Sequence, residues 1–197
     1  CDYNSHLRQS RNCYLNALGI KSEDCLYTYW TVENKDVMDS IFINYSTLQY
    51  EGRHLNYCYN GIMLEECNNS TDCYFSCQLR GCDHCLFCSN LANKSYYLWN
   101  KPCTKEEFEA AKNKILCGSW QQFMQAKEEF EKMKQQAVRR FTYLLKCENS
   151  TGDHLLSCKN CLDTFEGLNC EDCYHLTSFG NCKDVYNVYS AGWEPCE

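Results

Sequence analysis

Small, apolar and polar side chains recur along the first ninety residues with a spacing of twelve. One column of positions at this spacing is mostly cysteine: Cys1, Cys13, Cys25, Val37, Gln49, Gly61, Cys73 and Cys85. The residue after each is large: Tyr14, Leu26, Met38, Tyr50, Ile62, Tyr74 and Leu86. Three residues before it, the side chains are small: Ser10, Ser22, Asn34, Ser46, Cys58, Ser70 and Cys82. The residue just before it is mostly Asn or Asp: Asn12, Asp24, Asp36, Leu48, Asn60, Asp72 and His84.

A period of twelve is too short for a helical repeat, which needs at least about 20 residues. It is long enough for two short strands and two turns, which make one coil of a flattened β-solenoid. Successive coils stack about 4.8 Å apart, so equivalent positions form ladders. Inward ladders must be small or apolar, and corner ladders favour Asn and Asp, which tolerate turn dihedral angles. The pattern therefore predicts a mainly β fold, with solenoid coils of 12 residues over residues 1–98.

The same period returns near the C-terminus. Residues 157–168, 169–180 and 181–192 align without gaps. Their aligned columns are Cys158, Cys170 and Cys182, then Cys161, Cys173 and Val185. We therefore expect a second set of solenoid coils over residues 149–193.

Residues 104–146 have a different composition, rich in Lys, Glu, Gln and Phe. Thr104 with Glu107 and Ser119 with Gln122 are capping-box pairs, which mark helix starts. After the second pair, apolar residues recur every three or four positions: Phe123, Ala126, Phe130, Met133, Ala137, Phe141 and Leu144. This stripe predicts an inserted amphipathic helical hairpin that packs on the solenoid. An exposed stripe that binds a partner is the alternative.

Charge and hydropathy exclude some classes of function. The formal net charge is −7, and the chain has no polybasic tract, so we expect no nucleic-acid binding. No apolar run approaches about 18 residues, so we expect no membrane span. Residues 104–146 hold nine Lys or Arg against six acidic residues, and the remainder holds ten against twenty. A basic helical segment in an otherwise acidic chain suits self-association or a basic protein partner. The abrupt start at Cys1 suggests a fragment of a longer protein.

The strongest chemical candidates among the nineteen cysteines are CxxC pairs. Pairs of this kind can hold zinc or iron, and the candidate ligands are Cys82, Cys85, Cys88, Cys158, Cys161, Cys170 and Cys173. However, equivalent positions in other coils carry Ser, Asn or Val, which a packing column accepts and a ligand site does not. The pattern therefore favours structural thiols and a cytoplasmic over a secreted location. A metal-binding module and a disulfide-stapled secreted binding domain remain the alternatives.

Enzymatic motifs are missing from the sequence. It contains no nucleophile elbow, P-loop, HExxH or dinucleotide fingerprint. The histidines are scattered, and His84 suits a corner ladder better than a ligand set. The tyrosine ladder, with Tyr14, Tyr50 and Tyr74, could stack carbohydrate or bases if it were exposed, although a packing column is the simpler interpretation. We therefore expect a non-enzymatic scaffold or protein-interaction module, without a cofactor unless the cysteines bind zinc.

Residues 82–116 resemble a segment of large cysteine-rich repeat proteins from candidate-phyla bacteria. The matching elements follow that family's order: Asn90-Leu91, Asn93-Lys94, Tyr96, Asn100 and Lys105-Glu106-Glu107-Phe108. The stretches NCYL at 12–15 and EDCLY at 23–27 are also similar to it. That family has no established activity, and this chain lacks the zinc-ribbon-like cysteine pairs of its longer members. The resemblance therefore implies no functional residues.

Overall fold

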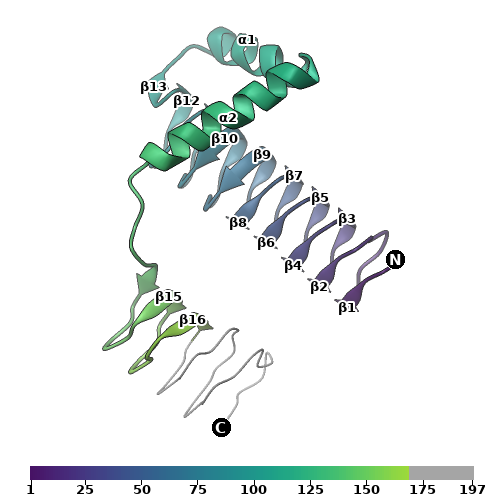
Figure 1. Ribbon diagram of the computed structural model, residues 1–197, viewed down its shortest axis with the longest axis vertical. Helices are drawn as coiled ribbons and strands as arrows, with labels where there is room; N and C mark the ends of the chain where they lie inside the picture. The colour runs from purple at the N-terminus through teal and green to yellow at the C-terminus, as the bar shows by residue number, and fades with distance from the viewer. Residues whose placement is uncertain (169–197) are drawn as a thin grey trace. The chain divides into compact units, whose positions relative to one another are not determined.

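The computed structural model describes residues 1–168, and the chain divides into two compact units, residues 1–138 and 139–197. Short strands dominate the first unit, followed by two helices (Figure 1). Its strands are β1 Ser5–Arg8, β2 Ala17–Ile20, β3 Glu23–Leu26, β4 Tyr29–Val32, β5 Lys35–Met38, β6 Ile41–Asn44, β7 Thr47–Tyr50, β8 Arg53–Asn56, β9 Tyr59–Glu65, β10 Thr71–Cys77, β11 Asp83–Leu86, β12 Ser95–Leu98 and β13 Lys101–Pro102. Its helices are α1 Lys105–Leu116 and α2 Trp120–Gln136. The second unit contains β14 Leu144–Leu145, β15 Gly152–Leu156 and β16 Thr164–Leu168.

The strands of the first unit pair in parallel with a register of twelve residues. Cys25 is opposite Val37, Val37 is opposite Gln49, and Cys73 is opposite Cys85. One row of strands runs β1-β2-β4-β6-β8-β9, and a second runs β3-β5-β7-β9 before both continue through β10. The predicted β-solenoid is confirmed, with about eight turns of about 12 residues.

A finer period of three residues lies inside each coil. Every third residue from Tyr3 to Trp99 has φ between +47° and +60°, although glycine occupies just one of these positions, Gly81. Such left-handed residues are rare outside glycine, Asn and Asp. The residue after each left-handed one points inward, and every third residue from Cys13 to Cys88 is buried. A coil is therefore four triplets, each consisting of an inward, an outward and a left-handed residue.

Two of the four inward columns, those of Cys25 and Ser22, were predicted, and so was the Asn/Asp corner column. The other two inward columns mix residue types too freely to stand out. One contains Asn16, Thr28, Ser40, Gly52, Leu64, Ser76 and Cys88; the other contains Gly19, Thr31, Ile43, Leu55, Cys67 and Leu79.

Polar inward side chains connect one coil to the next. The Asn34 amide donates a hydrogen bond to the Ile43 carbonyl at 2.6 Å and accepts one from the Ser46 N–H at 2.8 Å. The Ser46 hydroxyl in turn accepts a hydrogen bond from the Cys58 N–H at 3.0 Å. These bonds satisfy inward backbone groups, which would be costly to bury without partners. The interior therefore selects small side chains that can also accept a hydrogen bond.

Both helices begin at the predicted capping boxes. Thr104 caps α1 with Glu107, and Ser119 caps α2 with Gln122. The predicted length of the second helix was wrong, because α2 ends at Gln136 and Phe141 is fully exposed. Leu144 lies in β14 instead, paired in parallel with Leu155. Strand pairing within the second unit therefore outweighs the helical spacing of these two residues.

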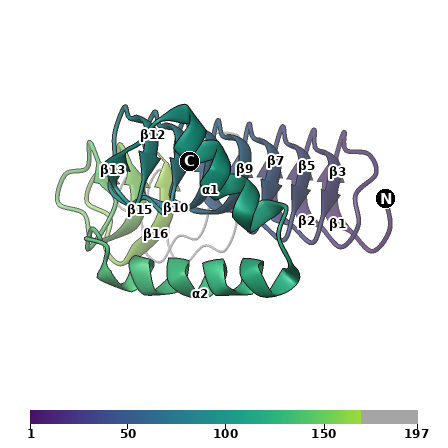
Figure 2. The same ribbon diagram turned by 90° about the horizontal axis from the view of Figure 1, so that it is seen from above.

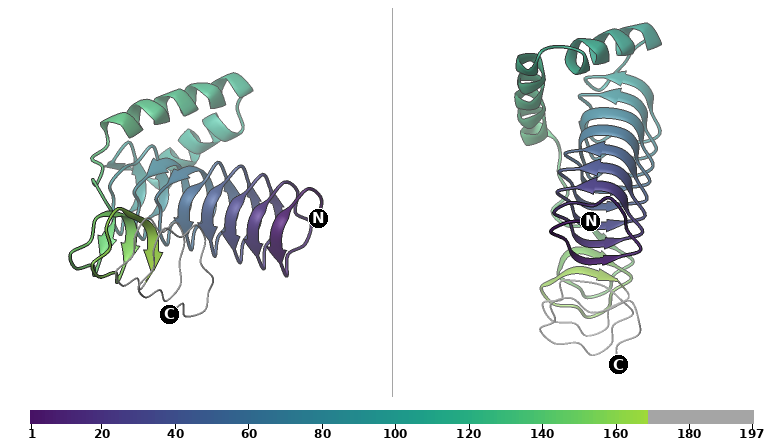
Figure 3. Two further views of the ribbon diagram at one scale, coloured as in Figure 1. Left: turned by 60° about the horizontal axis from the view of Figure 1, so that its bottom comes forward. Right: turned by 90° about the vertical axis from the view of Figure 1, so that its right-hand side faces the viewer.

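The helices cover the outward side of the later coils of the first unit, and α2 runs alongside the stack (Figures 2 and 3). Phe108 of α1 and Ala126 and Phe130 of α2 are buried with outward residues of the coils. These outward partners are Met63, Tyr74, Phe75, Cys77, Leu86 and Phe87. The prediction that the helical stripe packs on the solenoid is therefore confirmed for the part of the stripe that is helical. Neither helix among the described residues is long and apolar enough to cross a membrane.

The predicted boundaries compare with these elements as follows. The predicted coils of residues 1–98 end where β12 ends, at Leu98. The predicted hairpin of residues 104–146 contains α1, α2 and the short strand β14. Of the predicted segment 149–193, β15 and β16 continue the parallel pairing, and residues 169–193 lie outside the described residues.

The inward hydrogen bonds can be tested at Asn34. Replacing Asn34 with Ala leaves the Ile43 carbonyl and the Ser46 N–H without this partner, so we expect a loss of about 2–4 kcal/mol in the free energy of unfolding. Asn34→Ser should cost less, because Ser22 and Ser46 occupy the same column. Arg53→Ala, at an exposed strand position, should change stability by less than about 0.5 kcal/mol. Urea denaturation measures all three. Equal losses for Asn34→Ala and Arg53→Ala would contradict the proposed role.

Candidate functional site

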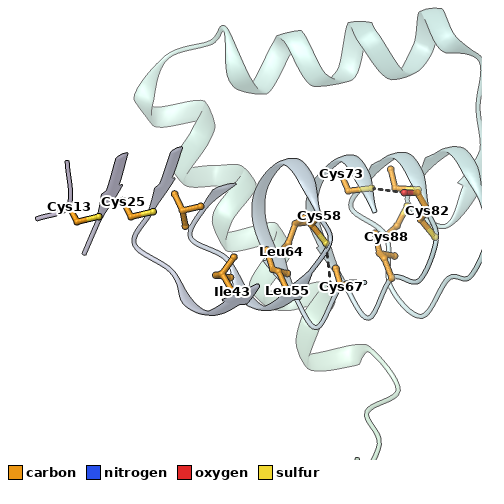
Figure 4. Packing of buried hydrophobic residues seen from close by; sticks show 13 residues of the cluster. Cys13, Cys25, Ile43, Leu55, Cys58, Leu64, Cys67, Cys73, Cys82 and Cys88 are labelled. Atoms are coloured by element: carbon orange, nitrogen blue, oxygen red, sulfur yellow. Dashed lines mark hydrogen bonds between the residues drawn. The ribbon is translucent and has the colours of Figure 1, made fainter. Parts of the chain in front are cut away.

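Three of the predicted metal ligands lie together inside one coil. Cys82, Cys85 and Cys88 are successive inward residues, and Cys73 lies one coil earlier in the Cys85 column. Figure 4 shows Cys73, Cys82 and Cys88 among the apolar side chains of the same interior. The Cys85 thiol contacts those of Cys73 and Cys88. Because every third residue points inward, cysteines that lie three residues apart in the sequence share one interior.

These thiols are also directed at backbone carbonyls. The sulfurs of Cys82 and Cys88 lie 3.4 Å from the carbonyl oxygens of Leu91 and Tyr97, respectively. Cys58 makes the same contact with Cys67 at 3.3 Å (Figure 4). A thiol is a weak donor, and here it replaces the Asn or Ser found elsewhere in these columns.

Burial raises the pKa of several inward thiols. It raises the pKa of Cys58 to about 11 and that of Cys25 to about 12. Burial also raises the pKa of Cys67 well above its ordinary value. For Cys88, the contact with Cys85 and then burial raise the pKa. Because metal ligands and nucleophiles are thiolates, these environments suit packing rather than reaction.

The remaining predicted ligands lie in the second unit. Cys158 and Cys161 are buried there, three residues apart, and each follows a left-handed residue. Cys170 and Cys173 lie outside the described residues. None of the fifteen cysteines of residues 1–168 is in a disulfide. Metal binding by any of these cysteines stays a prediction.

Within residues 1–168, one group of three potential ligands has all its ligand atoms within 4.8 Å of one another, and it contains no cysteine. It consists of Asp72, Asp83 and His84. The two ring nitrogens of His84 lie 2.8 Å from Asp83 Oδ2 and 3.8 Å from Asp72 Oδ2. The ring also stacks on Tyr96 at 4.6 Å between centroids. His84 has φ +52° and is indeed a corner residue, with its ring nitrogens facing the two neighbouring acids.

Aromatic side chains form ladders on the outside of the coils, but most of their ring faces are occupied. Tyr45 and Tyr57 stack at 4.8 Å with 7° between their planes. Phe42 stacks on His54 at 4.9 Å. In the predicted tyrosine column, Tyr74 is buried under the helices, and Tyr50 lies beside Phe123. Rings that stack on one another present edges outward, which argues against a platform for sugars or bases.

One outer surface remains apolar and exposed. The columns that α1 and α2 cover at Tyr74 and Phe75 continue toward the N-terminus without a helix over them. We call this part the uncovered face, formed by Tyr14, Leu15, Leu26, Tyr27 and Met38. The exposed fractions are 37% for Tyr14, 51% for Tyr27 and 38% for Met38. Sequence analysis identified the column of Tyr14, Leu26 and Met38 but not the neighbouring column of Leu15 and Tyr27.

A shallow groove of about 420 Å³ hollows this surface between Leu26 and the start of α2. It is lined by Leu26, Met38, Leu48, Tyr50 and Ile62, and Asp24 and Asp36 lie along it.

No family model matches the chain, and no curated protein matches it. Among solved structures, it is similar to a "putative acetyltransferase" from Desulfovibrio desulfuricans G20. The likeness covers 85% of this chain and 44% of the other, with 13% sequence identity and a TM-score of 0.17. The chain therefore spans less than half the length of that protein, and agreement this low carries no argument about function.

The buried thiols make stability sensitive to alkaline pH. An unfolded thiol ionises near its ordinary pKa of 9.0, whereas Cys58 in the folded state ionises at about 11. Between these values only the unfolded state releases the proton, so stability is intact below about pH 8.5 and falls as pH rises. Cys58 alone should contribute a loss of about 2–3 kcal/mol by pH 11. Urea denaturation in reductant at several pH values measures this. The free energy of unfolding of Cys58→Ser should fall less steeply with pH than that of the parent chain. Equal slopes for the two proteins would contradict the role assigned to Cys58.

Elemental analysis of anaerobically purified protein tests the metal prediction. If the thiols are packing groups, zinc and iron should each fall below about a tenth of an equivalent per chain. Thiol titration of the denatured sample measures how many cysteines are reduced. If all nineteen cysteines are structural thiols, nineteen free thiols are expected. If the parent chain holds a stoichiometric metal and the variant with Cys85→Ser and Cys88→Ser loses it, the cysteines are the metal ligands.

Proposed function

We propose that this protein is a non-enzymatic β-solenoid module that binds another protein through the uncovered face. The observation that carries this proposal is one continuous column: the helices bury it at Tyr74, and toward the N-terminus it stays apolar and becomes exposed at Met38 and Tyr14. Exposed apolar surface of this kind is typical of interaction sites. The face is rigid, because every coil is hydrogen-bonded to its neighbours.

The chemistry of the interior supports a structural rather than a catalytic role. The buried Asn34 and Ser46 side chains are occupied by backbone groups, and burial raises the pKa of the Cys67 thiol. The acidic cluster at His84 is self-paired, with both ring nitrogens facing carboxylates. A metal-binding module is the second candidate, because Cys73, Cys82, Cys85 and Cys88 are inward residues of adjacent coils, although no three sulfurs of residues 1–168 lie within 4.8 Å of one another.

Photo-cross-linking at matched positions tests the proposal. Tyr27 and Tyr57 are both left-handed residues, with exposed fractions of 51% and 59%. Tyr57 lies half a coil away from the column of Tyr27, on another side of the stack. Benzoylphenylalanine at position 27, in a lysate of the organism that encodes the chain, should give a reproducible adduct with one protein. The same probe at position 57 should not. Equal labelling from both positions, or none from position 27, would contradict the proposal.

A further inference from the structure

The contacts of α2 with the solenoid show which kind of helix the outer surface of the coils binds. Two phenylalanines of α2 provide the apolar contacts: Phe123 lies 5.5 Å and Phe130 lies 6.3 Å from the Phe75 ring, between centroids. Four residues after each phenylalanine comes a lysine that pairs with an acid of the coils. Lys127 lies 2.6 Å from Glu51, and Lys134 lies 2.9 Å from Glu65. The helix thus combines an apolar stripe with a flanking row of lysines.

The groove of the uncovered face adjoins the surface on which this helix sits. It is lined by Tyr50, which α2 reaches through Phe123 at 6.5 Å between ring centroids, and it extends past Met38 to Leu26. Apolar and acidic residues line it together, with Asp24 and Asp36 in the corner column that precedes the Cys25 column. The groove therefore resembles the α2 surface in composition, although its acids belong to a different column from Glu51 and Glu65.

The acids along the groove are not paired with a cation of the described residues, although Asp24 accepts a hydrogen bond from the Asn12 side-chain amide at 3.0 Å. Arg11 and Lys35, the nearby basic residues, are both paired with Glu23. Within residues 1–168, neither Asp24 nor Asp36 has a lysine or arginine nitrogen within 4.0 Å. Residues 1–98 contain seven Lys or Arg against eleven Asp or Glu, so the surrounding field also favours a cation.

We propose that the partner is a basic amphipathic helix that seats its apolar stripe in this groove and pairs its lysines or arginines with Asp24 and Asp36. This is the helix-in-groove mode of recognition. The inference rests on the proposed function, because it specifies the partner of the same face.

Three synthetic peptides with one apolar stripe test the charge requirement. The first is residues 119–137, which contain three lysines and three glutamates. The second is a basic version with Glu128→Lys and Glu129→Lys, and the third is an acidic version with Lys127→Glu and Lys132→Glu. Fluorescence anisotropy with the full chain should show the basic peptide binding roughly fivefold more tightly than the native-sequence peptide, and the acidic one more weakly. The preference should shrink at high salt.

Variants of the chain locate the binding. Asp24→Asn with Asp36→Asn should remove the preference for the basic peptide while preserving the fold, because Asn tolerates the left-handed backbone of both positions. Leu26→Lys with Met38→Lys should abolish binding of all three peptides. Tyr57→Lys, at an exposed position half a coil away from the Tyr27 column, should leave binding unchanged. Circular dichroism and thermal denaturation confirm that each variant is folded.

The outcomes separate the two proposals. If all three peptides bind equally and all are lost with Leu26→Lys and Met38→Lys, the face binds proteins but the charge assignment is wrong. If the basic peptide binds the Leu26→Lys and Met38→Lys variant as tightly as the parent chain, or does not bind the parent chain at all, the inference is overturned. A position-27 adduct in the cross-linking experiment would still support the proposed function in that case.

Discussion

The interior of each coil has room for only four inward side chains, and the chain must place one there at every third residue. These side chains have to fit a narrow space, in which Ile43 and Leu55 are among the largest, and the backbone groups beside them need hydrogen-bond partners because water does not reach them. Asn and Ser meet both demands, as Asn34 and Ser46 show. Cys meets them more weakly and adds apolar volume, as Cys58 shows at the Cys67 carbonyl. This constraint explains an unusual core in which thiols and amides are packed together.

The same constraint determines the outside. Turning the chain inward every three residues requires a left-handed residue in every triplet, and each costs roughly 1–2 kcal/mol when it is not glycine. The ladders of hydrogen bonds between coils must offset that cost. Left-handed positions such as Tyr45 and Tyr57 then stack on one another along the outside, because the register of twelve puts them in line. Their ring faces are used in that stacking, so many of the aromatic residues of this chain stabilise the coils.

The helices show how such a stack can bind something else. Outward columns of apolar residues have no neighbour within the coil, and α2 covers them with Phe123 and Phe130 while its lysines pair with Glu51 and Glu65. In the earlier coils the Tyr74 column stays apolar at Met38 and Leu26, and Asp24 and Asp36 lie beside it, in a different column from those glutamates. An intramolecular contact thereby defines the chemistry expected of an external one.

The twelve-residue spacing of Cys25, Val37 and Gln49 was enough to predict the solenoid, and the Asn/Asp column was enough to predict a corner, because a register repeats residue types at a fixed distance. The capping boxes at Thr104 and Ser119 likewise predicted both helix starts from local hydrogen bonding alone. The end of α2, the convergence of Cys73, Cys82, Cys85 and Cys88, and the exposure of Leu15 and Tyr27 required the tertiary structure. Helix length was decided by a competing strand partner for Leu144, and exposure was decided by how far α2 extends along the stack; both depend on residues distant in the sequence, which no local pattern records.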